Sequence, residues 1–238
     1  MRLFFAVPAL LIAMSGPAAA VQLLINGDFE TGDYTGWFAS QQLGSSGNLF
    51  VSTPGTPSLV SGFATAANPM GGAYYSITDQ SGAGAYALVQ SFTVPLGATS
   101  VILSFQMFAN DQSGVGPIIN PAGLDYSAGA NQHALVDILI NGAGAFTNAA
   151  GDIVTTLYQG IDAGPNPNPY TDYLFDLTAL LTPGATYQIR FGEVDNQFFF
   201  QHGVDNVSIV AEVGDVPAPT ALGLFGLALG ALALRRRA

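Results

Sequence analysis

The sequence predicts an all-β protein, specifically a jelly-roll-like antiparallel β-sandwich, and three observations support this fold class. Short runs of β-branched and aromatic residues with approximate two-residue alternation recur along the chain. Proline, glycine and asparagine residues separate these runs and supply turns. The apolar spacing of amphipathic helices is nearly absent. Many short strands joined by turns are typical of β-sandwiches.

The clearest candidate strands are five runs, which lie at residues 85–94, 100–109, 133–140, 185–194 and 204–212. In the second run the odd positions are apolar: Val101, Leu103, Phe105, Met107 and Ala109. Because successive side chains of a strand point to opposite faces, these five should enter the core together.

Two glycine-, proline- and asparagine-rich segments, 114–131 and 160–169, interrupt the strand pattern. They are long for connections in a compact domain, and long loops on a rigid scaffold commonly carry binding residues. Tyr126 lies in the first segment and Tyr170 directly follows the second. We expect both rings to be exposed and to stack on sugar rings as ligand-binding residues. Trp37, the single tryptophan, is instead expected in the core.

The chain begins with the features of a secretory signal peptide, predicted to cover residues 1–20. Arg2 supplies the positive charge, residues 3–14 form an apolar run, and Ala18–Ala20 offer a small-residue cleavage site. The mature protein is therefore predicted to start at Val21, and a single domain is expected over residues 21–215.

The charge balance of this domain is strongly acidic. Arg190 is its only Lys or Arg, against 16 carboxylates of which 13 are Asp. Nucleic acid is excluded as a partner because phosphate backbones require Lys and Arg. Divalent cations are the natural complement, since Asp oxygens suit Ca²⁺, while a solubilising acidic surface is the alternative. The absence of cysteine excludes disulfides and thiolate sites.

Residues 216–238 combine a proline motif, an uncharged apolar run and a terminal basic cluster. The residues of the two flanking motifs are Val216, Pro217, Ala218, Pro219, Arg235, Arg236 and Arg237. This order resembles the PEP-CTERM sorting signal, with Ala218 at the position of the family's glutamate. The resemblance implies an exosortase-type membrane protease as a partner and delivery to the extracellular space or cell surface. A simple C-terminal anchor helix is the alternative.

The apolar part of this segment, 221–234, is shorter than the roughly 20 residues that span a bilayer. We therefore expect only transient membrane insertion through a hydrophobic sorting helix, with the arginines on the cytoplasmic side.

Motifs at both ends of the domain resemble carbohydrate-binding modules of the galactose-binding type. They are Asn26–Glu30 followed by Gly36-Trp37, and Val204–Ser208 near the end. The resemblance implies a structural Ca²⁺ that joins the first strand to the last, held by Glu30 and Asp205 with the carbonyl of Asp28. Without a metal, Asp28 or Glu30 would cap a turn and Asp205 would bond backbone amides in a bulge.

The stretch 193–197, ahead of Gln201 and His202, concentrates oxygen ligands in a predicted hairpin loop. It is interpreted either as a second cation or polar-ligand site or as a solvated turn. No nucleophile elbow, zincin motif or phosphate loop is present. A glycosidase pair of carboxylates is not singled out among the 16, so we predict no enzyme activity.

Together these features predict a secreted protein that binds or organises exopolysaccharide through a lectin-like β-sandwich. A structural matrix or adhesion protein with Ca²⁺-dependent self-association and no glycan ligand is the alternative. A glycan-active hydrolase is less favoured.

Overall fold

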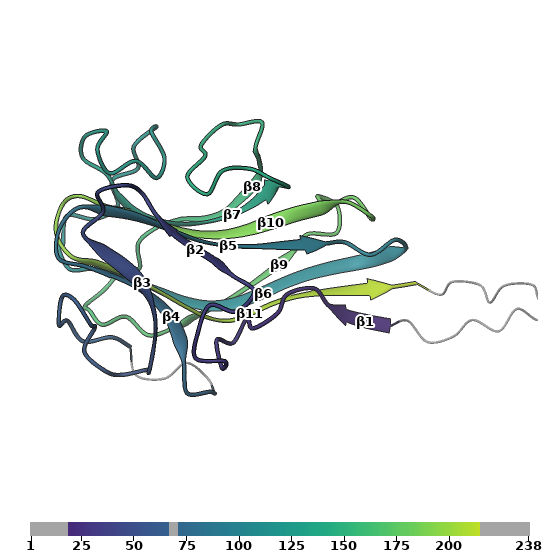
Figure 1. Cartoon of the computed structure of the whole chain (residues 1–238), viewed down its shortest axis with the longest axis horizontal. Coiled ribbons are helices and arrows are strands. Elements are labelled where there is room, and N and C mark those ends of the chain that lie inside the picture. Colours follow the sequence, from purple (N-terminus) through teal and green to yellow (C-terminus); the bar gives the residue numbers. More distant parts are fainter. Residues whose placement is uncertain (1–18, 67–70, 215–238) are drawn as a thin grey trace, which may run out of the picture.

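The computed structural model describes residues 19–66 and 71–214, and these residues form two antiparallel sheets that pack face to face (Figure 1). Eleven strands and no helix occur in this part of the chain. The strands are β1 (Ala19–Gln22), β2 (Phe38–Gln41), β3 (Gly47–Ser52), β4 (Tyr75–Gln80), β5 (Gly84–Thr93), β6 (Ala98–Asp111), β7 (Gln132–Ile140), β8 (Ile153–Gly160), β9 (Thr171–Asp176), β10 (Thr186–Asp195) and β11 (Phe200–Val213). The predicted all-β sandwich is confirmed.

One sheet has six strands in the order β3-β4-β11-β6-β9, with β1 paired to β11, and the other has five in the order β2-β5-β10-β7-β8. The five predicted runs correspond to β5, β6, β7, β10 and β11. All five of these strands are interior to their sheets. Their sequences are rich in apolar residues because one face of each strand packs in the core, which also made them the easiest strands to predict.

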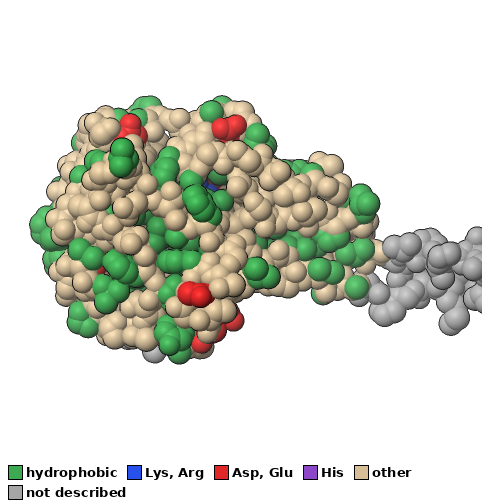
Figure 2. All heavy atoms as spheres, viewed as in Figure 1, with side chains coloured by type: hydrophobic (Ala, Val, Ile, Leu, Met, Phe, Trp, Pro, Cys, Tyr) green, Lys and Arg blue, Asp and Glu red, His purple; other side chains and the backbone are tan. Residues whose placement is uncertain are grey.

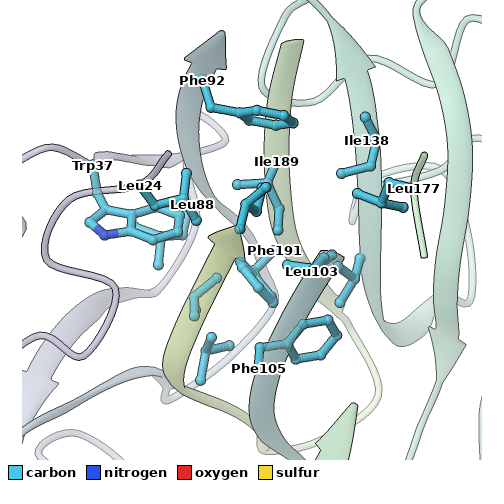
Figure 3. Close-up of a cluster of buried hydrophobic side chains, with 14 of the residues drawn as sticks. Leu24, Trp37, Leu88, Phe92, Leu103, Phe105, Ile138, Leu177, Ile189 and Phe191 are labelled. Atoms are coloured by element: carbon cyan, nitrogen blue, oxygen red, sulfur yellow. The ribbon is translucent and has the colours of Figure 1, made fainter. Parts of the chain in front are cut away.

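The core between the sheets is built from the alternating residues of these central strands (Figure 3). Val101, Leu103 and Phe105 are buried there, as their spacing predicts. The Phe105 ring meets the Phe191 ring of the opposite sheet edge-on, with centroids 5.1 Å apart. Trp37 is 8% exposed and lies in this cluster, which confirms its predicted core position.

The N-terminal segment completes the six-stranded sheet along the edge of β11. Leu23 N donates to Ile209 O at 2.8 Å, and Val207 N donates to Gly27 O at 2.8 Å. Position 27 must be glycine, because a Cβ there would lie 1.9 Å from Val207 O. The first and last parts of the domain are therefore joined by backbone hydrogen bonds.

The predicted termini of the mature protein fall at the limits of the described residues. The predicted cleavage after Ala20 lies inside β1, so the mature strand would keep Val21 and Gln22. Most of the predicted signal peptide and the whole predicted sorting helix, 216–238, lie outside the described residues. Within residues 19–66 and 71–214 there is no helix that could cross a membrane.

Replacing Phe105 by alanine should lower the free energy of unfolding by about 3–5 kcal/mol, because it leaves a cavity between the sheets. Leu174→Ala on the neighbouring strand β9 is the control, since Leu174 is 73% exposed. The control should change the free energy of unfolding by no more than about 0.5 kcal/mol. Denaturant titrations in which both variants lose the same stability would contradict this placement of the core.

Candidate functional site

The outer face of the five-stranded sheet carries a row of residues that alternation places on one side. Phe38 pairs with Val89, Val89 with Arg190, and Arg190 with Asp137, across four neighbouring strands. Directly paired residues of antiparallel strands point to the same face. This row therefore crosses the sheet on the side away from the core.

A groove of about 440 Å³ opens at one end of this face, and its walls are Gly36, Trp37, Phe38, Val89, Ser91 and Gln188. The Phe38 side chain is 61% exposed there. Ser91 is exposed as well, and the Gln188 Oε1 atom is buried without a hydrogen-bond partner. The groove thus combines an exposed aromatic ring, a hydroxyl group and an acceptor that lacks a donor.

Sequence reasoning missed Phe38 and Gln188 as site residues. A signal was available in β10, where Gln188 and Arg190 interrupt the apolar residues Ile189 and Phe191 at every second position. That alternation places the polar pair on the face opposite the core.

A buried ion pair, Arg190 with Asp137, lies farther along the same row. Arg190 Nε and Nη2 both donate to Asp137 Oδ2, the former at 3.1 Å. Arg190 Nη1 donates to the carbonyls of Ala145 and Thr147 at 3.0 and 2.8 Å. The pair therefore fixes the 141–152 loop over the sheet.

Asparagine side chains fix the neighbouring 114–131 loop in a defined conformation. Asn131 Nδ2 donates to the carbonyls of Gly123 and Asp125 at 2.7 and 3.1 Å. Asn148 Nδ2 donates to Pro121 O at 2.9 Å and links this loop to the 141–152 loop. Figure 1 shows both loops on the same side of the sandwich, above β7, β8 and β10.

Tyr126, a predicted ligand-binding residue, is half-buried within the first of these loops. Its ring packs against the cluster of Ala85, Leu124, Leu135 and Val194, and its hydroxyl donates to Leu43 O at 2.9 Å. That hydrogen bond uses the donor of the phenol in the fold itself. A ligand role for Tyr126 stays a prediction.

The expected exposure of Tyr170 is wrong. Its ring packs edge-on against Phe108 and Tyr75, with centroids 5.0 and 6.0 Å away, and its hydroxyl oxygen is buried without a partner. Burial raises the pKa of this phenol, with Tyr75 and Asp205 adding to the effect. The cause is non-local: Asn168 N donates to Asn110 Oδ1 at 2.8 Å and holds the end of the 160–169 loop against the sheet.

Asp28 and Glu30, two of the predicted metal ligands, lie near enough to the third, Asp205, for their charges to affect it, at the junction of the N-terminal segment and β11. Asp205 is 1% exposed, its Oδ1 accepts from Asn206 N at 2.7 Å, and its Oδ2 is buried without a partner. Burial, assisted by the nearby charges of Glu30 and Asp28, raises the pKa of Asp205 to about 7. The calcium clamp expected between the first and last strands stays a prediction.

Part of the alternative without metal also holds at this junction. Glu30 Oε1 accepts from Ala73 N and Tyr74 N at 2.7 and 2.9 Å, and Asp28 Oδ1 accepts from Glu30 N at 3.4 Å. Within the described residues, no three or more His, Cys, Asp or Glu side chains are grouped so that they alone could hold a metal ion.

The interpretation of the 193–197 stretch as a solvated turn is wrong for its two acids. Glu193 and Asp195 point between the sheets from β10 and are fully buried. Burial raises the pKa of Glu193 well above its ordinary value and that of Asp195 to about 6. Asp195 Oδ2 accepts from Gln80 Nε2 at 2.7 Å, and burial lowers the pKa of His202 to about 3. The stretch forms a polar end of the core.

A second groove, of about 340 Å³, lies on the outer face of the six-stranded sheet around Ser104, Gln106, Asp172, Leu174 and Asn206. Its polar groups already satisfy one another. Gln106 Nε2 donates to Asp172 Oδ1 at 2.7 Å, and Asn206 Nδ2 donates to Gln106 Oε1 at 2.8 Å. We therefore favour the groove at Phe38, where an acceptor is left without a donor.

Comparison with known proteins identifies the C-terminal segment. Residues 215–237 match the PEP-CTERM protein-sorting motif. The predicted resemblance to this signal is confirmed, and it indicates a secreted protein. No curated protein sequence matches the chain.

Several solved structures are similar to the chain at low sequence identity and with TM-scores below 0.5. The carbohydrate-binding module TmCBM61, in complex with β-1,4-galactotriose, is 11% identical with a TM-score of 0.49, over 79% of this chain and 97% of that one. The K1 adhesin domain of Lys-gingipain from Porphyromonas gingivalis W83 is 15% identical with a TM-score of 0.42, over 82% and 98%. A family 11 carbohydrate-binding module from Clostridium thermocellum is 16% identical with a TM-score of 0.38, over 85% and 99%.

Stability without added metal should fall as the pH rises from about 4 to about 7. The pKa values of Asp205 and Asp195 are raised to about 7 and about 6 in the folded state, against about 3.9 in the unfolded chain. The folded state therefore binds more protons in this interval, and its advantage is lost as these groups ionise. Each unit of pKa difference corresponds to about 1.4 kcal/mol.

Melting temperatures in EDTA at pH 5 and pH 8 test this prediction. Asp205→Asn should reduce the difference between the two temperatures. Asp176→Asn is the control, because this exposed carboxylate has a pKa lowered by hydrogen bonds from Thr178 and should not reduce the difference. If the melting temperature changes equally between pH 5 and pH 8 in wild type and in Asp205→Asn, Asp205 is not the group responsible.

Proposed function

We propose that the domain over residues 21–215 binds extracellular carbohydrate on the outer face of its five-stranded sheet. The observation that carries this proposal is the groove at Phe38 and Gln188. An exposed aromatic ring supplies a flat apolar surface for a sugar ring, and Gln188 Oε1 is a buried acceptor for a sugar hydroxyl. The volume of the groove, about 440 Å³, lies within the range of roughly 300–1,000 Å³ that is usual for ligand sites.

The groove supports binding without catalysis. Glycoside hydrolysis uses two carboxyl groups that flank the scissile bond. None of the residues that line this groove is an Asp or a Glu. We therefore propose a binding protein and not an enzyme.

The sorting motif gives this binding domain its proposed setting. We infer that an exosortase-type membrane protease processes the segment 216–238 after its transient insertion in the membrane. The protein would then act outside the cell or at the cell surface, where it would bind or organise exopolysaccharide. A cationic contact to the ligand would be limited to Arg190, since it is the one Lys or Arg of the described residues.

We further propose that Ca²⁺ joins the N-terminal segment to β11. The residues fit this ion: Asp205 Oδ2 is buried without a partner, Glu30 and Asp28 lie close enough to raise the pKa of Asp205, and hard oxygen ligands suit Ca²⁺. Backbone carbonyls, that of Asp28 among them, would have to complete the coordination. The bound ion would supply a positive charge to balance the carboxylates of Asp28, Glu30 and Asp205, which have no cationic side chain as a partner among the described residues.

Phe38→Ala and Gln188→Ala should each weaken retention of the protein on an immobilised polysaccharide from its native host by at least about tenfold, without unfolding it. The first variant removes the stacking surface and the second removes the acceptor. Leu174→Ala, an exposed apolar residue on the other sheet, should leave retention unchanged. Affinity electrophoresis that finds all three variants as strongly retained as wild type would move the function to a matrix protein without a glycan ligand.

Millimolar Ca²⁺ should raise the melting temperature, because an ion that binds only the folded state stabilises it by mass action. Glu30→Gln and Asp205→Asn should each abolish the increase, and Asp176→Asn should keep it. Calorimetry in Ca²⁺ and in EDTA measures the effect. Identical melting temperatures under the two conditions would exclude the calcium clamp.

Mature protein from the native host should lack Arg235–Arg237, because a protease that acts near Val216–Pro219 removes them. Intact-mass spectrometry decides this directly. A mature mass that includes Ala238 would indicate a retained anchor and would rule out processing of this Val-Pro-Ala-Pro sequence.

A further inference from the structure

A cavity of about 250 Å³ lies on the outer face of the five-stranded sheet, beneath the 114–131 and 141–152 loops. Its walls come from the 114–131 loop, with Ile119 and Asn120, and from the 141–152 loop, with Asn148. Asp137 of β7 and Arg190 of β10 line it from the sheet. Thr156 and Gln159 of the edge strand β8 line its side toward solvent, because both side chains are exposed. Figure 2 shows a hollow in this face, with basic atoms recessed inside it.

The guanidinium of Arg190 is already committed to the protein. Nε and Nη2 donate to Asp137 Oδ2, and Nη1 donates to the carbonyls of Ala145 and Thr147. Four of its five N–H groups are therefore used, so it cannot offer a two-pronged contact to a carboxylate or phosphate. An anionic ligand finds no free cation in this cavity.

Asp137, in contrast, has a carboxylate oxygen that receives no hydrogen bond. The residue is 1% exposed, and its Oδ1 atom is buried without any hydrogen-bond partner while Arg190 holds its Oδ2. A buried acceptor of this kind requires a donor. A hydroxyl group of a ligand in the cavity would supply one, and Arg190 keeps the carboxylate oriented to receive it.

Size and lining restrict the ligand further. A volume of about 250 Å³ is below the roughly 300–1,000 Å³ of sites for drug-sized molecules, so it suits one ring and not a chain segment. Ile119, Leu124 and Ile153 provide apolar walls, while Asn120 and Asn148 provide polar ones. A sugar ring has the same combination of C–H faces and hydroxyl groups.

We propose that this cavity, named here the Asp137 pocket, binds the terminal neutral sugar of a polysaccharide chain, with Asp137 Oδ1 accepting a hydrogen bond from a ring hydroxyl. The inference rests on the proposed function, because it names the ligand class and the end-on binding mode on the same face. The groove at Phe38 would then contact a part of the polysaccharide farther from the terminus.

Nuclear magnetic resonance titrations of the full domain with glucose, galactose, mannose, glucuronate and glucosamine test the proposal. At least one neutral hexose should bind in the millimolar range. Thr156→Phe, which fills the entrance from an exposed position, and Asp137→Asn should each weaken this binding by at least about tenfold. Thr171→Phe, the same change at an exposed threonine of β9 in the other sheet, is the matched control and should leave hexose binding unchanged. Thr156→Phe keeps the test informative if Asp137→Asn fails to fold.

Absence of binding by every neutral hexose would overturn the proposal, as would glucuronate or glucosamine binding as tightly as any neutral hexose. Hexose binding that Thr156→Phe leaves intact would overturn it too. Retention of wild type on polysaccharide separates this failure from that of the proposed function. If the wild type is retained on polysaccharide but binds no hexose, only the proposal for the Asp137 pocket fails. If it is not retained at all, both proposals fail.

Discussion

The ion pair of Arg190 with Asp137 connects two strands and a loop of the proposed binding face. It bridges β10 and β7, and through Nη1 it holds the 141–152 loop over the sheet. That loop in turn meets the 114–131 loop through Asn148. Removing one partner of a buried pair leaves an uncompensated charge, which typically costs about 3–5 kcal/mol. The shape of this face therefore depends on the single arginine of the domain.

Three other buried carboxylates of the described residues have no cationic partner and have a raised pKa. Glu193 and Asp195 lie between the sheets, and Asp205 lies at the junction with the N-terminal segment. Burial raises the pKa of each of them and favours their protonated forms, and at Asp205 the proposed calcium ion would supply an opposing charge. Buried Asp79 and Asp111, by contrast, accept hydrogen bonds from Ser61 and Ser113. A fixed cation organises the proposed binding face, and buried acids elsewhere are satisfied by hydrogen bonds or have raised pKa values.

The sequence was sufficient for five of the six interior strands and for the residues that alternate into the core. The buried interior strand β4 was missed because its sequence, YSITDQ, is largely polar. The edge strands β2, β3, β8 and β9 were not predicted, because they are short or half-exposed and their patterns are weak. Tyr170 was misplaced because Asn110 and Asn168, 58 positions apart, hold its loop down. The Asp137 pocket depends on contacts between two loops and three strands, and no local pattern contains that information. The alternation of Gln188 and Arg190 against the apolar residues of β10 did carry a usable signal.

The central claim is that carbohydrate binds on the outer face of the five-stranded sheet. Mapping of backbone amide shifts on addition of oligosaccharides cut from the host polysaccharide tests it most directly. The account predicts that perturbed amides concentrate in β2, β5, β7 and β10 and in the loops 114–131 and 141–152. Perturbations concentrated instead around Ser104, Gln106 and Leu174, on the outer face of the six-stranded sheet, would contradict it.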